Sequence, residues 1–291
     1  MTVLYYVYYG TFFYLLYRAT VTDFASLTIS DRVTVFGTVF AVAANIGGFS
    51  LPATEIRWDG YTPMVRPMPL HLFSPNPAET LSPVMLWACC TALWCFWCFA
   101  MLDRVWYPQF SLQKNFIVFF RHLHRSKRTK YYLTAAVAGN LFFAATTGIL
   151  PNNAALLSPL VGMAVGMTLI WGTRIICSYI LQQEAMGFGD VTLMGMIGAF
   201  LGWQPCLLVF FLAPFAGLGF GIINWLRKGT NRMPYGPFLS AAAVFTVLTW
   251  SWIWQQTADI FSLGGIFIAS AMFVCLLLMG VLLRIMRLFR R

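Results

Sequence analysis

The chain has 291 residues, of which 59% are hydrophobic and 10% are charged. Soluble globular domains are about one quarter charged, so the composition excludes an ordinary soluble protein and predicts an all-α, polytopic membrane helix bundle. The formal charge of +10 does not indicate nucleic-acid binding in such a chain, because lysines and arginines hold the loops of membrane proteins in the cytoplasm.

Apolar stretches recur along the chain at about the 20-residue length that crosses a bilayer. We expect nine membrane-spanning helices. They are residues 3–17, 33–51, 83–102, 131–150, 157–181, 191–203, 206–226, 238–254 and 264–283. The sixth is short and ends at Trp203-Gln204-Pro205. We expect it either to stop inside the bilayer or to form a tight hairpin with the seventh.

The basic residues predict how these helices are oriented. With the N-terminus outside, sixteen of the 19 lysines and arginines lie in cytoplasmic segments. These segments are residues 18–32, 103–130, 182–190, 227–237 and 284–291. The positive-inside rule therefore predicts an external N-terminus and a cytoplasmic C-terminus. The external segment 52–82 contains six prolines and is expected to be an irregular connector, whereas the cytoplasmic segment 103–130 is strongly basic.

Neither the cysteines nor the histidines predict a metal site. Cys95 and Cys98 have the C-x-x-C spacing of zinc ligands, but they lie in an apolar stretch rich in Trp and Phe. His122 and His124 lie in a basic run without a neighbouring cysteine or acid. We expect small buried side chains at the first pair and a solvated basic face at the second, with no metal and no cofactor.

The most informative stretch is residues 184–204, EAMGFGDVTLMGMIGAFLGWQ, in which Asp190 separates a Gly-Phe-Gly turn from an apolar run. An ionisable residue at a membrane boundary is costly and marks a candidate functional site. The alternative is that Asp190 caps the next helix, because Asp is a preferred N-cap. Gly187 and Gly189 lack a Cβ, so the backbone there can turn sharply and approach another segment closely.

A second carboxylate on the same side of the membrane would give Asp190 a chemical role. Asp23, Asp31 and Asp103 are all expected on the cytoplasmic side with it. Two carboxylates held close together share one proton, so one is a base for a water molecule and the other, protonated, polarises a carbonyl. Such a dyad hydrolyses a peptide bond without a metal and without a serine or cysteine nucleophile.

Residues 185–204 resemble the second-aspartate motif of the type IV prepilin leader peptidases, a family of membrane-embedded aspartic proteases of the Gly-x-Gly-Asp type. The residues in common are Gly187, Gly189, Asp190, Leu193, Ile197, Gly198, Ala199, Gly202, Trp203 and Gln204. Residues 22–34 resemble the first-aspartate motif, D-x7-D/N-x-L-T. In this resemblance Asp23 stands in the catalytic place, Asp31 opens the next helix and Val33 replaces the leucine.

Residues 233–238, Met-Pro-Tyr-Gly-Pro-Phe, are similar to the Pro-Phe-Gly-Pro-Phe segment of the same family. The similarity implies that Pro234, Gly236 and Pro237 lie beside the active site. On the residues alone the segment is also a plausible helix start, because proline suits the first helical turn.

The resemblance implies an aspartic endopeptidase, with Asp23 and Asp190 as the dyad, that removes leader peptides from prepilin or pseudopilin precursors. It implies a multi-pass protein of the bacterial cytoplasmic (inner) membrane, in contact with lipids and not with nucleic acid, with one peptidase domain over residues 1–291. No counterpart of the family's zinc-binding, cysteine-rich region precedes Asp23, so N-methyltransferase activity is not expected. Four expected spans separate the aspartates where the family has two, and an inserted pair preserves their sidedness.

Three alternatives stay open on the sequence. Asp103 follows an apolar stretch, and only two expected spans separate it from Asp190, but a basic segment follows it where the motif should enter a helix. Membrane aspartates also occur in transporters and channels, although usually near the bilayer midplane on broken helices. A non-catalytic secretion-assembly protein is the third alternative. The sequence does not determine the oligomeric state.

Overall fold

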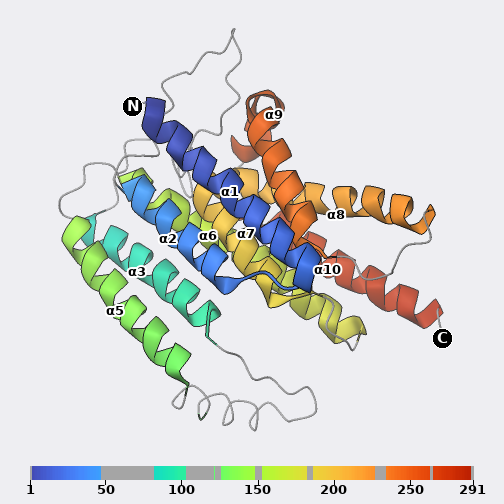
Figure 1. Ribbon diagram of the computed structural model, residues 1–291, viewed down its shortest axis with the longest axis horizontal. Helices are drawn as coiled ribbons and strands as arrows, with labels where there is room; N and C mark the ends of the chain where they lie inside the picture. The colour runs from blue at the N-terminus through green and yellow to red at the C-terminus, as the bar shows by residue number, and fades with distance from the viewer. Residues whose placement is uncertain are drawn as a thin grey trace. The chain divides into compact units, whose positions relative to one another are not determined.

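The computed structural model describes residues 2–46, 82–102, 121, 126–147, 153–181, 186–226, 234–262 and 265–289. Over these residues the regular structure is entirely helical (Figure 1). The helices are α1 (Thr2–Ser26), α2 (Asp31–Ile46), α3 (Pro83–Ala100), α5 (Lys127–Thr146), α6 (Asn153–Leu181), α7 (Phe188–Leu201), α8 (Trp203–Leu226), α9 (Gly236–Ser262) and α10 (Gly265–Phe289).

Each of the nine apolar stretches of the sequence coincides with one of these helices. The predicted connector 52–82, except for Ser82, lies outside the described residues, as does most of the predicted basic segment 103–130. Asp103 is among the residues that are not described. The structure therefore tests the predicted helices but not those two segments.

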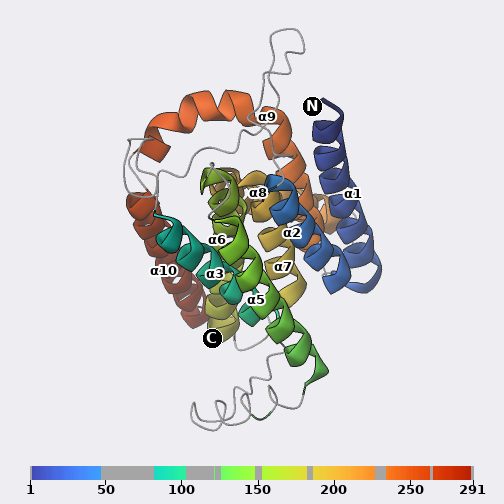
Figure 2. The same ribbon diagram turned by 90° about the vertical axis from the view of Figure 1, so that its left-hand side faces the viewer.

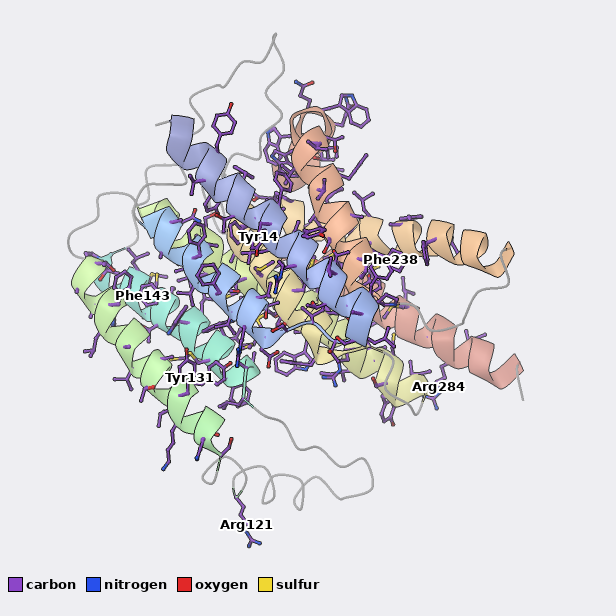
Figure 3. The ribbon with its side chains drawn as sticks, viewed as in Figure 1. Tyr14, Arg121, Tyr131, Phe143, Phe238 and Arg284 are labelled. Carbon is purple, nitrogen blue, oxygen red and sulfur yellow. The ribbon has the colours of Figure 1, made fainter. Side chains whose placement is uncertain are left out.

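Three of the described helices contain stretches long and apolar enough to cross a membrane, namely Pro83–Ala100, Leu157–Ile180 and Trp203–Phe220. Shorter apolar stretches occur in α7, α9 and α10. Large aromatic side chains such as Tyr14 and Tyr131 are 58% and 62% exposed (Figure 3), and hydrocarbon accommodates such a surface better than water does. The architecture is that of a membrane helical bundle, with fewer clear crossings in the described residues than the nine predicted.

The described helices form two compact units. The smaller unit is the pair α3 and α5, which run side by side (Figure 2). Within it, Trp94 Nε1 donates a hydrogen bond to the Ala135 carbonyl at 3.0 Å, and the indole of Trp94 packs where a Cβ on Gly139 would be. The larger unit comprises α1, α2 and α6 to α10, and it contains both Asp23 and Asp190.

Helix α7 is the buried centre of the larger unit. All of its residues from Asp190 to Leu201 are buried, and α2, α8 and α9 pack against it. Helix α6 crosses α7 at two glycines, because a Cβ on Gly162 would collide with the backbone carbonyl of Gly198. Small residues let helix backbones approach closely, as is common in membrane proteins. This packing fixes a helix of only 14 residues, which is too short to cross a bilayer by itself.

A single residue joins α7 to α8. Gly202 has φ 87°, in the left-handed region that favours glycine, and its N–H donates to the Gly198 carbonyl at 2.9 Å to close α7. The two helices are thus joined by a tight turn of one residue. The predicted boundary between them was wrong, because Trp203-Gln204-Pro205 opens α8 and does not end α7.

Candidate active site

The carboxylate of Asp23 is buried in the last turn of α1. The side chain is only 4% exposed. Its Oδ2 atom accepts a hydrogen bond of 2.9 Å from the backbone N–H of Gly236, at the start of α9. A residue near the beginning of the chain thus binds directly to the Pro-Tyr-Gly-Pro segment near its end. In this way Asp23, singled out by the sequence, meets Gly236 in the larger unit.

Asp190 lies in the first turn of α7 and is 6% exposed. Gly187 occupies the N-cap position of that helix, so the alternative that Asp190 is the N-cap is wrong. Its carboxylate accepts a hydrogen bond from the backbone of Gly187, as an acidic side chain at the third helical position does in a capping box. This bond fixes the side chain relative to the turn that precedes it.

Ile29 is the residue on which the three sequence motifs converge. The turn after α1 passes through Leu27, whose φ of 53° is unfavourable for a residue with a Cβ, and it brings the buried Ile29 back towards the site. A Cβ on Gly189 would lie 2.9 Å from Ile29 Cβ, and a Cβ on Gly236 would lie 2.9 Å from Ile29 Cδ1. Glycine is needed at position 189 because the Cβ and backbone of Ile29 cannot move aside, whereas at position 236 the nearest atom is Asp23 Oδ2, at 2.6 Å from an added Cβ.

The two glycines of the Gly-Phe-Gly turn have different roles. Neither has a positive φ, since Gly202 is the positive-φ glycine among the described residues. A Cβ on Gly187 would meet nothing closer than Asp190 Oδ2 at 3.8 Å, which is an ordinary contact. Close approach therefore requires glycine at position 189, whereas position 187 has room for a methyl group. Of the two reasons predicted for these glycines, close approach to another segment is confirmed at Gly189 and not at Gly187.

Burial raises the pKa of both carboxyl groups, which lie outside the apolar stretches predicted to cross the membrane. For Asp23, the hydrogen bond from Gly236 lowers the pKa again in part. For Asp190, burial and then the charge of Asp23 raise the pKa to about 7, against the lowering effects of the Gly187 hydrogen bond and of Arg174. The two carboxylates thus interact electrostatically, and the charge of Asp23 favours the protonated form of Asp190.

Tyr235 and Arg174 join this site although sequence reasoning assigned them no role. Burial, and then the charge of Asp190, raise the pKa of the Tyr235 phenol, so its hydroxyl stays protonated at neutral pH. Arg174 Nε donates to the Met186 carbonyl at 2.9 Å, immediately before Gly187. The available signal for Arg174 was its position, because it is the lone basic residue inside the apolar stretch 157–181.

The other residues predicted to support the site differ in their surroundings. Asp31 is the first residue of α2 and is exposed, whereas Pro237 is buried and Pro234 is half-buried. Ser30 accepts the first hydrogen bonds of α2 through its carbonyl, from Val33 at 3.0 Å and Thr34 at 3.4 Å. Asp31 therefore lies within the helix and not at its N-cap. Over the described parts of the chain, no cluster of three or more His, Cys, Asp or Glu side chains could hold a metal ion.

The fold and the site define a helical membrane protein with two buried, coupled aspartates at the ends of two helices. Residues 80–222 match the family model described as the type IV leader peptidase family. The chain is similar to this family over the matched residues, which make up just under half of its length. The match contains Asp190 and Asp103 but not Asp23, so Asp23 is linked to this site by the resemblance of residues 22–34 and by the tertiary structure.

Individual relatives agree with the family match. The prepilin leader peptidase/N-methyltransferase of Escherichia coli (strain K12) is 27% identical over 115 residues, which is 39% of this chain and 49% of that protein. The protein of the same name from Aeromonas salmonicida (strain A449) is 31% identical over 113 residues, or 38% of each chain. A type 4 prepilin-like proteins leader peptide-processing enzyme of Escherichia coli O78:H11 is 33% identical over 86 residues.

The aligned part covers at most half the length of these curated relatives. The similarity is therefore to a part of each relative and not to the whole enzyme. No solved structure matches the chain.

Proposed function

We propose that this chain is a membrane-embedded aspartic endopeptidase that removes the leader peptide from type IV prepilin-like precursors. The observation that carries the proposal is the burial of two carboxylates from distant parts of the sequence, Asp23 and Asp190, on segments that meet around Ile29. The charge of Asp23 also raises the pKa of Asp190. Buried carboxylates that share a proton are the catalytic groups of aspartic proteases. The relatives named as prepilin leader peptidases support the substrate class.

The chemistry follows from the unequal surroundings of the two groups. Each carboxylate accepts one backbone N–H. Burial and the charge of Asp23 raise the pKa of Asp190 to about 7, so in this proposal the proton resides on Asp190. The Asp23 carboxylate removes a proton from a water molecule whose oxygen attacks the scissile carbonyl carbon. Asp190 gives its proton to the carbonyl oxygen, and a neutral tetrahedral diol forms.

Collapse of the diol completes the reaction. The C–N bond breaks as Asp23 transfers its proton to the leaving amine, and one diol hydroxyl returns a proton to Asp190. The products are a carboxylic acid and an amine, and the dyad regains its starting protonation. Because both groups change roles within one cycle, a pH–rate profile reports the pair and not either residue alone.

We further propose that the enzyme is a multi-pass protein of the bacterial inner membrane, with its N-terminus outside and its site at the cytoplasmic surface. The uneven distribution of lysines and arginines supports this orientation. The precursor would be cleaved where an apolar helix enters the membrane, which suits carboxylates placed at helix ends beside an apolar run. In this proposal residues 1–291 are a single peptidase domain. It includes the pair α3 and α5, which forms a compact unit of its own and lies within the residues that match the family model.

Co-expression with a prepilin tests the function, in a bacterial host that lacks its own prepilin peptidase. The chain should shorten the precursor on a gel, and mass spectrometry should find a new N-terminus at the leader junction. Asp23→Asn or Asp190→Asn should each abolish the shortening, while Asp103→Asn retains it. A transporter, channel or assembly protein would leave the precursor intact. Loss of cleavage in Asp103→Asn alone, with full cleavage in Asp23→Asn, would transfer the first catalytic role to Asp103.

A further inference from the structure

Arg174 is a basic residue inside an apolar helix. It lies on α6 within the membrane-competent stretch Leu157–Ile180, and its side chain is half-buried. An arginine at such a position is costly unless it has partners, and it is retained where it serves a function. Its partners therefore indicate what it does.

Two contacts direct the Arg174 side chain to the turn before Asp190. Nε donates a hydrogen bond of 2.9 Å to the carbonyl of Met186. The guanidinium carbon lies 5.7 Å from the centre of the Phe188 ring, within the range of a cation–π interaction. The two contacts hold the residues on either side of Gly187, whose backbone in turn hydrogen-bonds to the Asp190 carboxylate.

The same arginine acts on Asp190 through its charge. Its positive charge lowers the pKa of the Asp190 carboxyl group and so opposes part of the effect of burial. Arg174 therefore both contacts the turn and places a positive charge near the Asp190 carboxylate. It does so from α6, a helix that carries neither aspartate. A lysine cannot reproduce both contacts, because it has no planar guanidinium to stack on Phe188 while donating to a carbonyl.

We propose that Arg174 is a positioning residue, which holds the turn at Met186–Phe188 and thereby fixes the Asp190 side chain that follows it. This inference rests on the proposed peptidase function of the dyad. Arg174 does not touch the reacting atoms in this assignment, so its removal alters the geometry and protonation of the pair.

Kinetics of purified full-length protein in detergent, with a prepilin leader peptide as substrate, test this role. Arg174→Gln should lower kcat by about 10- to 100-fold with little change in KM, because the site stays formed but misaligned. The pH–rate profile should also move to higher pH, because Asp190 loses a neighbouring positive charge. Arg174→Lys should restore the profile but only part of kcat, and Phe188→Leu should lower kcat without moving the profile.

Arg18→Gln is the matched control. Arg18 is an exposed arginine on α1, so this variant removes the same charge near the same end of the bundle, where solvent screens it. It should keep kcat within about two-fold of the unaltered protein and leave the profile in place. A lower yield of folded Arg174→Gln with an unchanged kcat and profile would overturn the proposal, because it would show a purely structural role.

Infrared titration separates this inference from the proposed function. The carboxylic C=O band that disappears in Asp190→Asn reports the protonation of Asp190 without any substrate. In Arg174→Gln this band should persist to higher pH, and an unmoved band would overturn the inference even if cleavage is observed. If no variant cleaves prepilin but the band still moves, the peptidase proposal fails while the influence of Arg174 on Asp190 stands.

Discussion

Helix α1 carries a buried polar cluster at each end, and the two clusters differ in charge. At its N-terminal end, the Tyr8 hydroxyl donates to the Phe200 carbonyl at 2.9 Å and accepts from Asn45 Nδ2 at 3.0 Å. These groups are neutral and satisfy one another. At the C-terminal end, Asp23 and Asp190 are acidic and buried, and the described contacts give each a backbone hydrogen-bond donor.

The difference teaches how to separate structural from functional polar groups in this protein. A buried neutral group with partners contributes about 1 kcal/mol of stability per hydrogen bond, and the Tyr8 cluster ties α1, α2 and α7 together. Two buried carboxylates with few donors destabilise the fold. Their retention is understandable where activity depends on them, because sites of function commonly reduce stability.

Substitutions that fill the space around the acidic cluster at the C-terminal end of α1 should have the largest effect. Gly236→Ala should lower cleavage by about 100-fold or more, because the added Cβ would lie 2.6 Å from Asp23 Oδ2. Gly187→Ala is the matched substitution, and it should keep cleavage within about three-fold, since its Cβ has room. Rates of prepilin cleavage by the purified variants measure both. Equal losses in the two variants would contradict the assignment of Gly236 to the site.

The two buried aspartates should lower the free energy of unfolding. Asp190→Asn should abolish cleavage while raising the free energy of unfolding at pH 8 by about 1–2 kcal/mol, because a buried charge is removed. Thermal unfolding in detergent measures the change, with the exposed Asp31→Asn as the control for loss of an acidic group. A lower unfolding midpoint for Asp190→Asn would mean that Asp190 stabilises the fold. It would contradict the proposed difference between the two clusters of α1.

Stability should also depend on pH through Asp190. Its pKa is raised in the folded protein to about 7, above the value of about 3.9 in an unfolded chain. The folded state therefore binds this proton more tightly, and the contribution to stability is complete below about pH 4 and is lost as the pH rises through 7. The unfolding midpoint in detergent should fall over this range, and the slope should flatten in Asp190→Asn. An unchanged slope would show that other groups cause the dependence.

Substitutions in the neutral Tyr8 cluster should have the smallest effect, and they should change stability but not activity. Tyr8→Phe removes the donor to Phe200 and the acceptor for Asn45, so it should cost about 1–2 kcal/mol of unfolding free energy. Cleavage per folded molecule should remain within about two-fold. Tyr14→Phe, at a position 58% exposed, is the control and should change stability by less than about 0.5 kcal/mol. A large loss of activity in folded Tyr8→Phe would mean that this cluster also serves the site.

Local patterns in the sequence determined the helices and the first half of the site. Apolar stretches predicted each described helix, because burial or contact with lipid needs a continuous apolar segment whatever its partners are. The Gly-x-Gly-Asp motif singled out Asp190 for a similar reason. A lone acidic residue beside an apolar run is unusual, and it can be recognised from a few neighbouring residues. Family resemblance then suggested Asp23, but it left Asp103 as a rival.

Tertiary packing decided what surrounds Asp190. The hydrogen bond from Gly236 to Asp23, the position of Ile29 between two glycines, and the contact of Arg174 with the turn all join segments that are distant along the chain. No local pattern encodes these distances, because they arise from how whole helices pack. For the same reason the sequence predicted that Gly189 permits a close approach to another segment but not which one: its backbone lies against Ile29, which only the folded chain brings there.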